Sequence, residues 1–229
     1  MADDKAIVVV AGATGRAGRL IVKELISRKF TVRAMIVPPF DPPQPEGFSV
    51  PGIEIVEGSL ESKESLEKVM GGADYLISAI GSTKYFNKKE FEKIDVTGNH
   101  NLAMAAKAKG VKQIVVISSI GAGNSRDAMT CIWRMMMGQV IKAKTKMEEA
   151  LISTGIDYTF VRPGGYTEKE LSGKIAIGEG GKFTGLVRRD QVATVCVDAI
   201  EKPAMKNRIF EVVDYSKIKE EHRQFVIEV

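Results

Sequence analysis

The chain has 229 residues, of which 44% are hydrophobic and 27% are charged, and its formal net charge is +4. This balance is usual for a soluble globular protein, and so small and dispersed a charge argues against nucleic acid as a partner. No apolar run approaches membrane-spanning length, and Cys131 and Cys196 lie outside any metal-ligand spacing. We therefore expect a cytoplasmic protein, or an organellar one whose targeting peptide has been removed, without a metal site.

The first element is an apolar run from Ile7 to Ala11, followed by Gly12, Gly15 and Gly18 and then by a helical pattern. This order predicts a strand, a tight turn and the start of a helix. Glycines let a ligand approach the main chain, and the unpaired N–H groups of a helix N-terminus attract anions. The segment predicts a site for the diphosphate of a dinucleotide, and the alternative is a structural turn without a ligand.

Strand-like and helix-like segments alternate along the rest of the chain. The predicted strands are 5–11, 31–37, 53–57, 74–80, 112–118, 157–161 and 207–213. The predicted helices are 16–28, 62–71, 88–109, 138–154 and 189–201. This alternation predicts a Rossmann-like α/β fold, in which a doubly wound parallel sheet lies between two helix layers in a single domain over residues 1–229.

Three segments interrupt this rhythm. Residues 38–52 hold six of the eight prolines and predict an extended loop, which either covers the adenine of a dinucleotide or is a plain surface loop. The glycine-rich residues 164–188 predict a small substrate lobe at the sheet edge that borders the ligand crevice. Residues 129–137 are rich in methionine, and they predict either an apolar roof for a flat ligand or partner helix, or ordinary packing.

The whole pattern resembles the short-chain dehydrogenase/reductase superfamily. Within it, the chain is most similar to the atypical branch that includes NmrA-like proteins, isoflavone-reductase-like enzymes and the biliverdin-IXβ/flavin reductases. The motifs that carry the resemblance run nearly end to end: Gly12–Gly18, Gly58–Leu60, Ser78–Gly81, Asp95–Leu102, Val116–Gly121, Arg162–Gly165 and Arg189–Ala193. The resemblance implies an NAD(P)-dependent oxidoreductase with a Rossmann-like fold.

The resemblance also implies where the cofactor and the substrate lie. The implied cofactor residues are Gly12, Thr14, Gly15, Arg16 and Ala17 at the diphosphate, Ser59 and Leu60 at the adenine, Ala79, Ile80 and Gly81 along the ribose and nicotinamide, and Pro163 and Gly164 at the carboxamide. Ser118 or Ser119 is implied to face the nicotinamide, and Lys146 matches the lysine that holds its ribose.

The chain departs from the superfamily at the catalytic tyrosine. Active members carry a tyrosine four residues before the lysine, where it serves as acid or base, but here that position is Lys142. Lys142 either donates a proton itself, with a lowered pKa, or is a solvated lysine. Hydride transfer is the cofactor's own chemistry, so a flavin, quinone or tetrapyrrole acceptor can take its proton from water.

Two other functions remain open from the sequence. The missing tyrosine also fits a non-catalytic NADP(H)-binding redox sensor or scaffold of the NmrA-like kind, which would have a protein partner. A nucleotide-sugar epimerase or dehydratase is a third alternative, but such enzymes rely on the missing tyrosine and on a longer substrate domain.

The cofactor is expected to be NADP(H) rather than NAD(H). The second predicted strand ends in Met35, Ile36 and Val37, without the carboxylate that would bind the ribose diol of NAD. A 2′-phosphate needs charge-assisted donors, and Arg16 and Arg33 are the candidates for this role.

Overall fold

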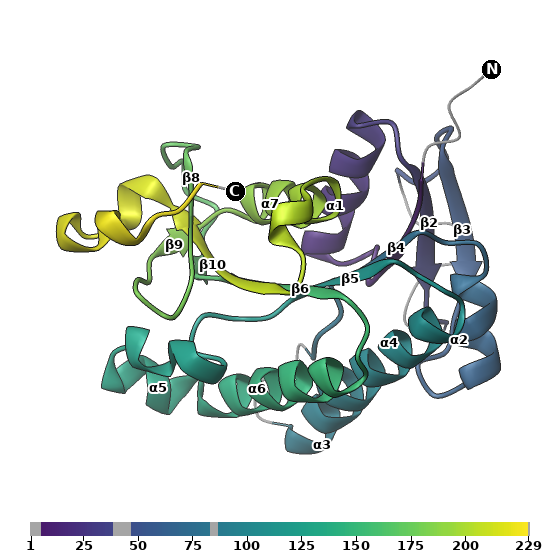
Figure 1. The fold of residues 1–229 in the computed structure, drawn as a ribbon, viewed down its shortest axis with the longest axis horizontal. Helices are drawn as coiled ribbons and strands as arrows, with labels where there is room; N and C mark the ends of the chain where they lie inside the picture. Colours follow the sequence, from purple (N-terminus) through teal and green to yellow (C-terminus); the bar gives the residue numbers. More distant parts are fainter. Residues whose placement is uncertain (1–5, 39–46, 83–86, 229) are drawn as a thin grey trace.

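A computed structural model describes residues 6–38, 47–82 and 87–228 of the chain (Figure 1). Most of the proline-rich segment, for which an extended loop was predicted, lies outside these described residues. Within them, no helix combines the length and apolar character that crossing a bilayer requires.

The centre of the fold is an eight-stranded sheet with the order β3-β2-β1-β4-β5-β6-β10-β8. Its strands are β1 (Ile7–Ala11), β2 (Thr31–Ile36), β3 (Ile53–Glu57), β4 (Tyr75–Ser78), β5 (Gln113–Ile117), β6 (Tyr158–Pro163), β8 (Ile175–Gly178) and β10 (Arg208–Asp214). All neighbouring strands are parallel except β8, which pairs antiparallel with β10. The predicted Rossmann-like fold is confirmed.

Two helix layers cover the sheet, as Figure 1 shows. One face carries α1 (Arg16–Ser27) and α7 (Arg189–Glu201), and the other carries α2 (Lys63–Met70), α4 (Asn99–Ala108) and α6 (Gly138–Ser153). Successive side chains of a strand point alternately to the two helix layers. Val8 and Val10 pack in the cluster with α1 and α7, whereas Val9 packs on the opposite side of the sheet. Because both faces are buried, the strands are continuous apolar runs.

The strand order reverses direction between β1 and β4. From β1 the chain builds outward through β2 to β3, and it then returns to place β4 on the other side of β1. In open α/β sheets a ligand binds at such a switch point, in the crevice outside the carboxyl ends of the strands. The segments that follow β1, β4, β5 and β6 meet at this edge.

The region 164–188 contains short strands rather than irregular chain alone. β7 (Gly165–Tyr166) and β9 (Leu186–Val187) form a separate two-stranded sheet, and β8 joins the main sheet. Asp214, at the end of β10, accepts hydrogen bonds from the Ser172 hydroxyl (2.6 Å) and the Gly173 N–H (3.0 Å). Burial alone would raise the pKa of Asp214, but hydrogen bonds from Ser172, Ser216 and other donors hold it well below its usual range. The carboxylate therefore ties this region to the sheet.

The single helix predicted over residues 88–109 is continuous but not uniform. It consists of α3 (Lys88–Glu90), a π-helical stretch (Phe91–Gly98) and α4. Within the wider turns, Asp95 is buried and accepts a hydrogen bond from the Ser82 N–H (2.8 Å). Wide turns of this kind often occur at functional sites, and tertiary contacts that sequence periodicity does not report decide where they form. α5 (Cys131–Met136) was not among the predicted helices.

We expect Gly18→Ala to destabilise the fold. Gly18 lies in the first turn of α1, where an added Cβ would be 2.0 Å from the Gly12 carbonyl oxygen. Because the obstacle is backbone, the variant should lose about 1–3 kcal/mol of unfolding free energy. Gly138→Ala is the matched control, since nothing lies within 4 Å of its added Cβ, and we expect it to stay within about 0.5 kcal/mol of wild type. Urea unfolding measures both, and equal losses would contradict the expectation.

Candidate active site

The glycine turn between β1 and α1 forms one end of the site. Gly12 has a φ of +77°, and its carbonyl oxygen accepts a hydrogen bond from the Gly15 N–H (3.1 Å). Gly15 is the N-cap residue of α1 and supplies no capping side chain, so the first N–H groups of the helix are left for other acceptors. This arrangement can hold an anion such as a diphosphate.

The turn lies directly against the segment that follows β4. A Cβ on Gly12 would come within 3.0–3.1 Å of the backbone of Ala79 and Ile80. Leu60 reaches the same edge, because a Cβ on Gly98 would lie 3.2 Å from the Leu60 Cδ1 and 3.5 Å from the Ile80 Cδ1. The structure thus brings together the residues expected at the diphosphate, the adenine and the ribose.

A buried ion pair lies beside Gly81, on the far side of this segment. The Lys144 Nζ is 2.8 Å from the Asp95 Oδ1 and donates a hydrogen bond to the Ile117 carbonyl oxygen (3.2 Å). A Cβ on Gly81 would lie 3.2 Å from the Asp95 Oδ1 and 3.5 Å from the Lys144 Nζ. The ammonium group is therefore fixed between the ends of β4 and β5.

Lys144, rather than Lys146, is the lysine of α6 that lies at the ends of β4 and β5. Lys146 lies on the surface, where its Nζ is 3.1 Å from Glu92 and 61% of its side chain is exposed. Lys142 is also exposed, whereas Lys144 is 8% exposed. The structure does not bring Lys146, expected at the nicotinamide ribose, to the edge of the sheet, and the exposed Lys142 fits the alternative of a solvated lysine. The residue four positions before Lys144 is Val140, so a tyrosine is missing in this register too.

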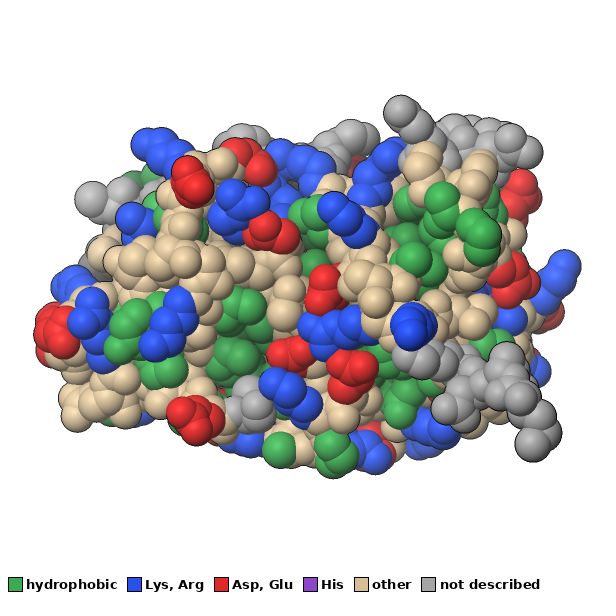
Figure 2. All heavy atoms as spheres, turned by 90° about the horizontal axis from the view of Figure 1, so that it is seen from above, with side chains coloured by type: hydrophobic (Ala, Val, Ile, Leu, Met, Phe, Trp, Pro, Cys, Tyr) green, Lys and Arg blue, Asp and Glu red, His purple; other side chains and the backbone are tan. Residues whose placement is uncertain are grey.

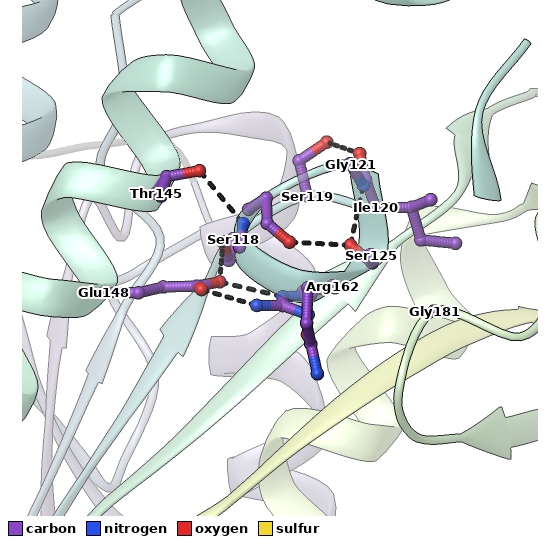
Figure 3. A network of polar contacts seen from close by, with 12 residues as sticks. Ser118, Ser119, Ile120, Gly121, Ser125, Thr145, Glu148, Arg162 and Gly181 are labelled. Atoms are coloured by element: carbon purple, nitrogen blue, oxygen red, sulfur yellow. Dashed lines mark hydrogen bonds and ion pairs between the residues drawn. The ribbon is translucent and has the colours of Figure 1, made fainter. Parts of the chain in front are cut away.

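The two serines after β5 differ in their surroundings (Figure 3). The Ser118 hydroxyl is 4% exposed and donates a short hydrogen bond to the Glu148 Oε1 (2.5 Å). Ser119 is partly exposed, and its hydroxyl donates to the Ile120 carbonyl oxygen (3.0 Å). Ser118 is thus engaged in the interior, and Ser119 is the serine a ligand reaches more easily.

Glu148 belongs to a buried ionic network beneath the site (Figure 3). Arg162, at the end of β6, donates hydrogen bonds to both Glu148 oxygens (3.0 and 2.7 Å) and to Glu211 (3.3 Å). Glu211 also accepts the Gly181 N–H (3.1 Å). Burial raises the pKa of Glu211, whereas the pKa of Arg162, which burial alone would lower, is raised by Glu148 and Glu211. The network joins α6, β6 and β10, and sequence analysis had given Arg162 no role beyond its motif.

Arg33 lies away from the crevice. Its guanidinium donates to the carbonyl oxygens of Val69 (2.8 Å) and Gly71 (2.7 Å) and to Glu54 (2.7 Å). These carbonyls belong to the C-terminal end of α2, which precedes β4 and therefore lies at the opposite edge of the sheet. The expectation that Arg33 binds a 2′-phosphate is wrong on this geometry. Arg16, at the first position of α1, is exposed, and within the described residues its guanidinium has no hydrogen-bond or ion-pair partner.

The remaining expected residues lie near the same edge or beside it. Ser59 follows β3, and its N–H donates to the Ser65 hydroxyl (3.0 Å). Pro163 is the last residue of β6. Gly164, which follows it, packs tightly against Gly185, because a Cβ added to Gly164 would lie 2.3 Å from the Gly185 carbonyl oxygen. The methionine segment is divided rather than a single roof: Met129 packs on a buried cluster, whereas Met135 and Met136 are 80% and 63% exposed.

Comparison with known proteins points to the same class of cofactor. Residues 12–203 match a family described as NAD(P)H-binding. Protein TIC 62, chloroplastic, of Pisum sativum is 32% identical over 235 residues, which cover 92% of this chain but 43% of that protein. Sanguinarine reductase of Eschscholzia californica is 28% identical over 254 residues, covering 92% and 90% of the two chains. The oxidoreductase ylbE of Lactococcus lactis has the same fold, with a TM-score of 0.78 at 21% identity over 95% of each chain.

Proposed function

Since the chain belongs to the NAD(P)H-binding family, we propose that it is an NAD(P)H-dependent oxidoreductase of the atypical short-chain type. Its acceptor would be a hydrophobic or conjugated molecule such as a flavin, a quinone or a tetrapyrrole. The observation that carries the proposal is the buried Lys144–Asp95 pair at Gly81, on the same sheet edge as the open N-terminus of α1. The N-terminus of α1 suits the diphosphate of the cofactor, and the Lys144–Asp95 pair suits the ribose that carries its nicotinamide ring.

Each end has a defined task in this proposal. The first N–H groups of α1 bind the diphosphate, and Gly12 leaves the space that a side chain would fill. The Lys144 ammonium has three N–H donors; Asp95 and Ile117 take two of them, and the third would bind a hydroxyl of the cofactor's ribose. The bound cofactor supplies the hydride. Ser119 orients the acceptor, and water supplies the proton that the superfamily's tyrosine would otherwise provide.

A reductase is favoured by the name of one relative. Sanguinarine reductase, which this chain matches over nearly the full length of both, is named as a reductase. TIC 62 is similar to this chain over less than half of its own length and carries no argument about its activity. The second candidate is a non-catalytic NADP(H) sensor with a protein partner, which the missing tyrosine and the exposed Met135 and Met136 on α5 favour.

The test is turnover by the purified chain. With saturating NADPH, loss of NADPH absorbance is followed in the presence of a flavin, a quinone and a tetrapyrrole in turn. Steady oxidation with at least one acceptor supports the reductase. Tight NADPH binding without oxidation of any kind would exclude it and leave the sensor.

For the cofactor, we propose NADP(H) with Arg16 at the 2′-phosphate. Arg16→Gln should weaken NADPH binding by about tenfold, because one charge-assisted hydrogen bond to a phosphate is lost, and should leave NADH binding unchanged. Arg33→Gln is the control, and its NADPH affinity should remain at the wild-type value. Fluorescence titration of NADPH and NADH measures both variants. An equal loss for the two cofactors would show that Arg16 does not distinguish them.

A further inference from the structure

A hollow of about 400 Å³ lies between the N-terminal ends of α1 and α7. It is lined by four arginines and two carboxylates, namely Arg16, Arg19, Arg188, Arg189, Glu168 and Asp190. The lining therefore carries an excess of positive charge. Figure 2 views the molecule from the side that α1 and α7 cover, where basic and acidic side chains are intermingled.

The hollow lies on the acceptor side of the glycine turn. α1 packs against β1 and β2, whereas α7 packs against β5 and β6, so the seam between these helices runs beneath the centre of the sheet. In dinucleotide-binding folds the adenosine ribose lies at the end of the second strand, on the other side of α1. Arg16, on the α1 side of the hollow, is the residue we assign to the 2′-phosphate, so a second anion in the hollow would be bound from the α7 side, where Arg189 lies.

Arg189 is the best placed cation in the hollow. Its guanidinium stacks on the Tyr166 ring at 4.3 Å from the ring centroid, and 14% of its side chain is exposed. Tyr166 is in β7, which continues from Pro163 and Gly164, the segment proposed at the carboxamide. Contact with Tyr166 therefore holds Arg189 in place, and the short strand β7 connects this contact to the segment proposed at the nicotinamide carboxamide.

The present partner of Arg189 is easily replaced. Arg189 pairs with Glu168, whose side chain is 81% exposed, and ion pairs with so exposed a partner contribute little to stability. Arg188, by contrast, donates three hydrogen bonds to Asp190 (2.7–3.2 Å). An incoming phosphate or carboxylate can take the place of Glu168 on Arg189 and gain a bidentate contact.

We propose that this hollow binds an anionic group, a phosphate or a carboxylate, of the acceptor, with Arg189 as its principal ligand. The inference rests on the proposed reductase function, because it assigns the hollow to the acceptor. It narrows the acceptor class to conjugated molecules that carry a negatively charged substituent.

Riboflavin and FMN provide a direct test, because they share the ring system and differ by one phosphate. Quenching of flavin fluorescence by the NADP⁺-saturated protein should show FMN binding about tenfold more tightly than riboflavin. Arg189→Gln should abolish this preference and leave riboflavin binding unchanged. Glu168→Gln, which removes the competing carboxylate, should strengthen FMN binding alone. Lys23→Gln makes the same charge change as Arg189→Gln on an exposed part of α1 outside the hollow and should preserve the preference.

Equal affinities of the wild-type protein for the two flavins would overturn the inference, as would equal losses in Arg189→Gln and Lys23→Gln. A preference for FMN seen with NAD⁺ but not with NADP⁺ would also overturn it, because the 2′-phosphate would then occupy the hollow. Flavin binding is measured without turnover, so the anion site and the reductase function are tested separately. If the protein prefers FMN but oxidises no NADPH, only the reductase proposal is contradicted. If it oxidises NADPH but does not prefer FMN over riboflavin, only the anion site is contradicted.

Discussion

Lys144→Met is expected to weaken NADPH binding and to lower kcat/KM by about 10- to 100-fold, because a charge-assisted hydrogen bond to the ribose is lost. Methionine keeps the length of the buried stem but removes the ammonium group. Lys146→Met, two residues further along α6, should leave both quantities within about twofold, since exposed pairs such as Lys146–Glu92 contribute little. Fluorescence titration and the turnover assay measure the two effects.

The Lys144→Met variant also leaves Asp95 as a buried carboxylate without its cation, so its stability should fall. Lys144→Met/Asp95→Asn separates stability from function, because it removes the uncompensated charge as well. The double variant should recover much of the unfolding free energy but none of the NADPH affinity. If affinity returned together with stability, Lys144 would have only a structural role. If Lys146→Met lost as much as Lys144→Met, the placement of the site would be wrong.

Arg162→Met is expected to lower the free energy of unfolding by about 3–5 kcal/mol, since removing one partner of a buried ion pair leaves uncompensated charge. Both carboxylates that Arg162 bridges, Glu148 and Glu211, are almost fully buried. Arg28→Met is the matched control: Arg28 also pairs with Glu24, Asp198 and Glu201, but its side chain is 23% exposed, against 2% for Arg162. Because water screens its charge more, we expect a smaller loss in Arg28→Met, of about 1–2 kcal/mol. Equal losses in the two variants, measured by urea unfolding, would contradict this difference.

The loss of unfolding free energy in Arg162→Met should depend on pH. Burial already raises the folded-state pKa of Glu211, and without the guanidinium this pKa rises further above its unfolded value. A carboxyl whose folded pKa is raised loses stability as the pH rises through that pKa. The variant should therefore be closer to wild type at pH of about 5 than at about 8. A deficit that grows on acidification would mean that the carboxylates are not its cause.

The sheet was predictable because its strands are apolar runs separated by helix-length segments. β1 and β5, for example, are buried on both faces, and both are uninterrupted or nearly uninterrupted apolar runs in the sequence. The two-residue strands β7 and β9 were not predictable, since so short a segment has no periodicity. The π-helical stretch around Asp95 also leaves no periodic signal, because contacts with Ser82 and Lys144 fix it from other parts of the chain.

The site was predictable in its backbone and less so in its long side chains. The glycine turn lies against the segment after β4, and the sequence indicates this arrangement because glycine spacing reports the backbone itself. Lys146 was chosen over Lys144 by motif alone, although the buried positions Ile141, Lys144, Glu148 and Leu151 follow helical spacing and indicate the inward face of α6. Arg33 was a candidate only as a basic residue of the second strand, and the sequence does not show toward which edge of the sheet its side chain extends.

The most direct test is a titration of the purified chain with NADPH and NADH, followed by nicotinamide fluorescence. If the edge from the glycine turn to Lys144 is a dinucleotide site with Arg16 at the 2′-phosphate, NADPH should saturate the protein and bind about tenfold more tightly than NADH. Equal binding of the two would contradict the choice of cofactor. A protein that binds neither would contradict the site itself.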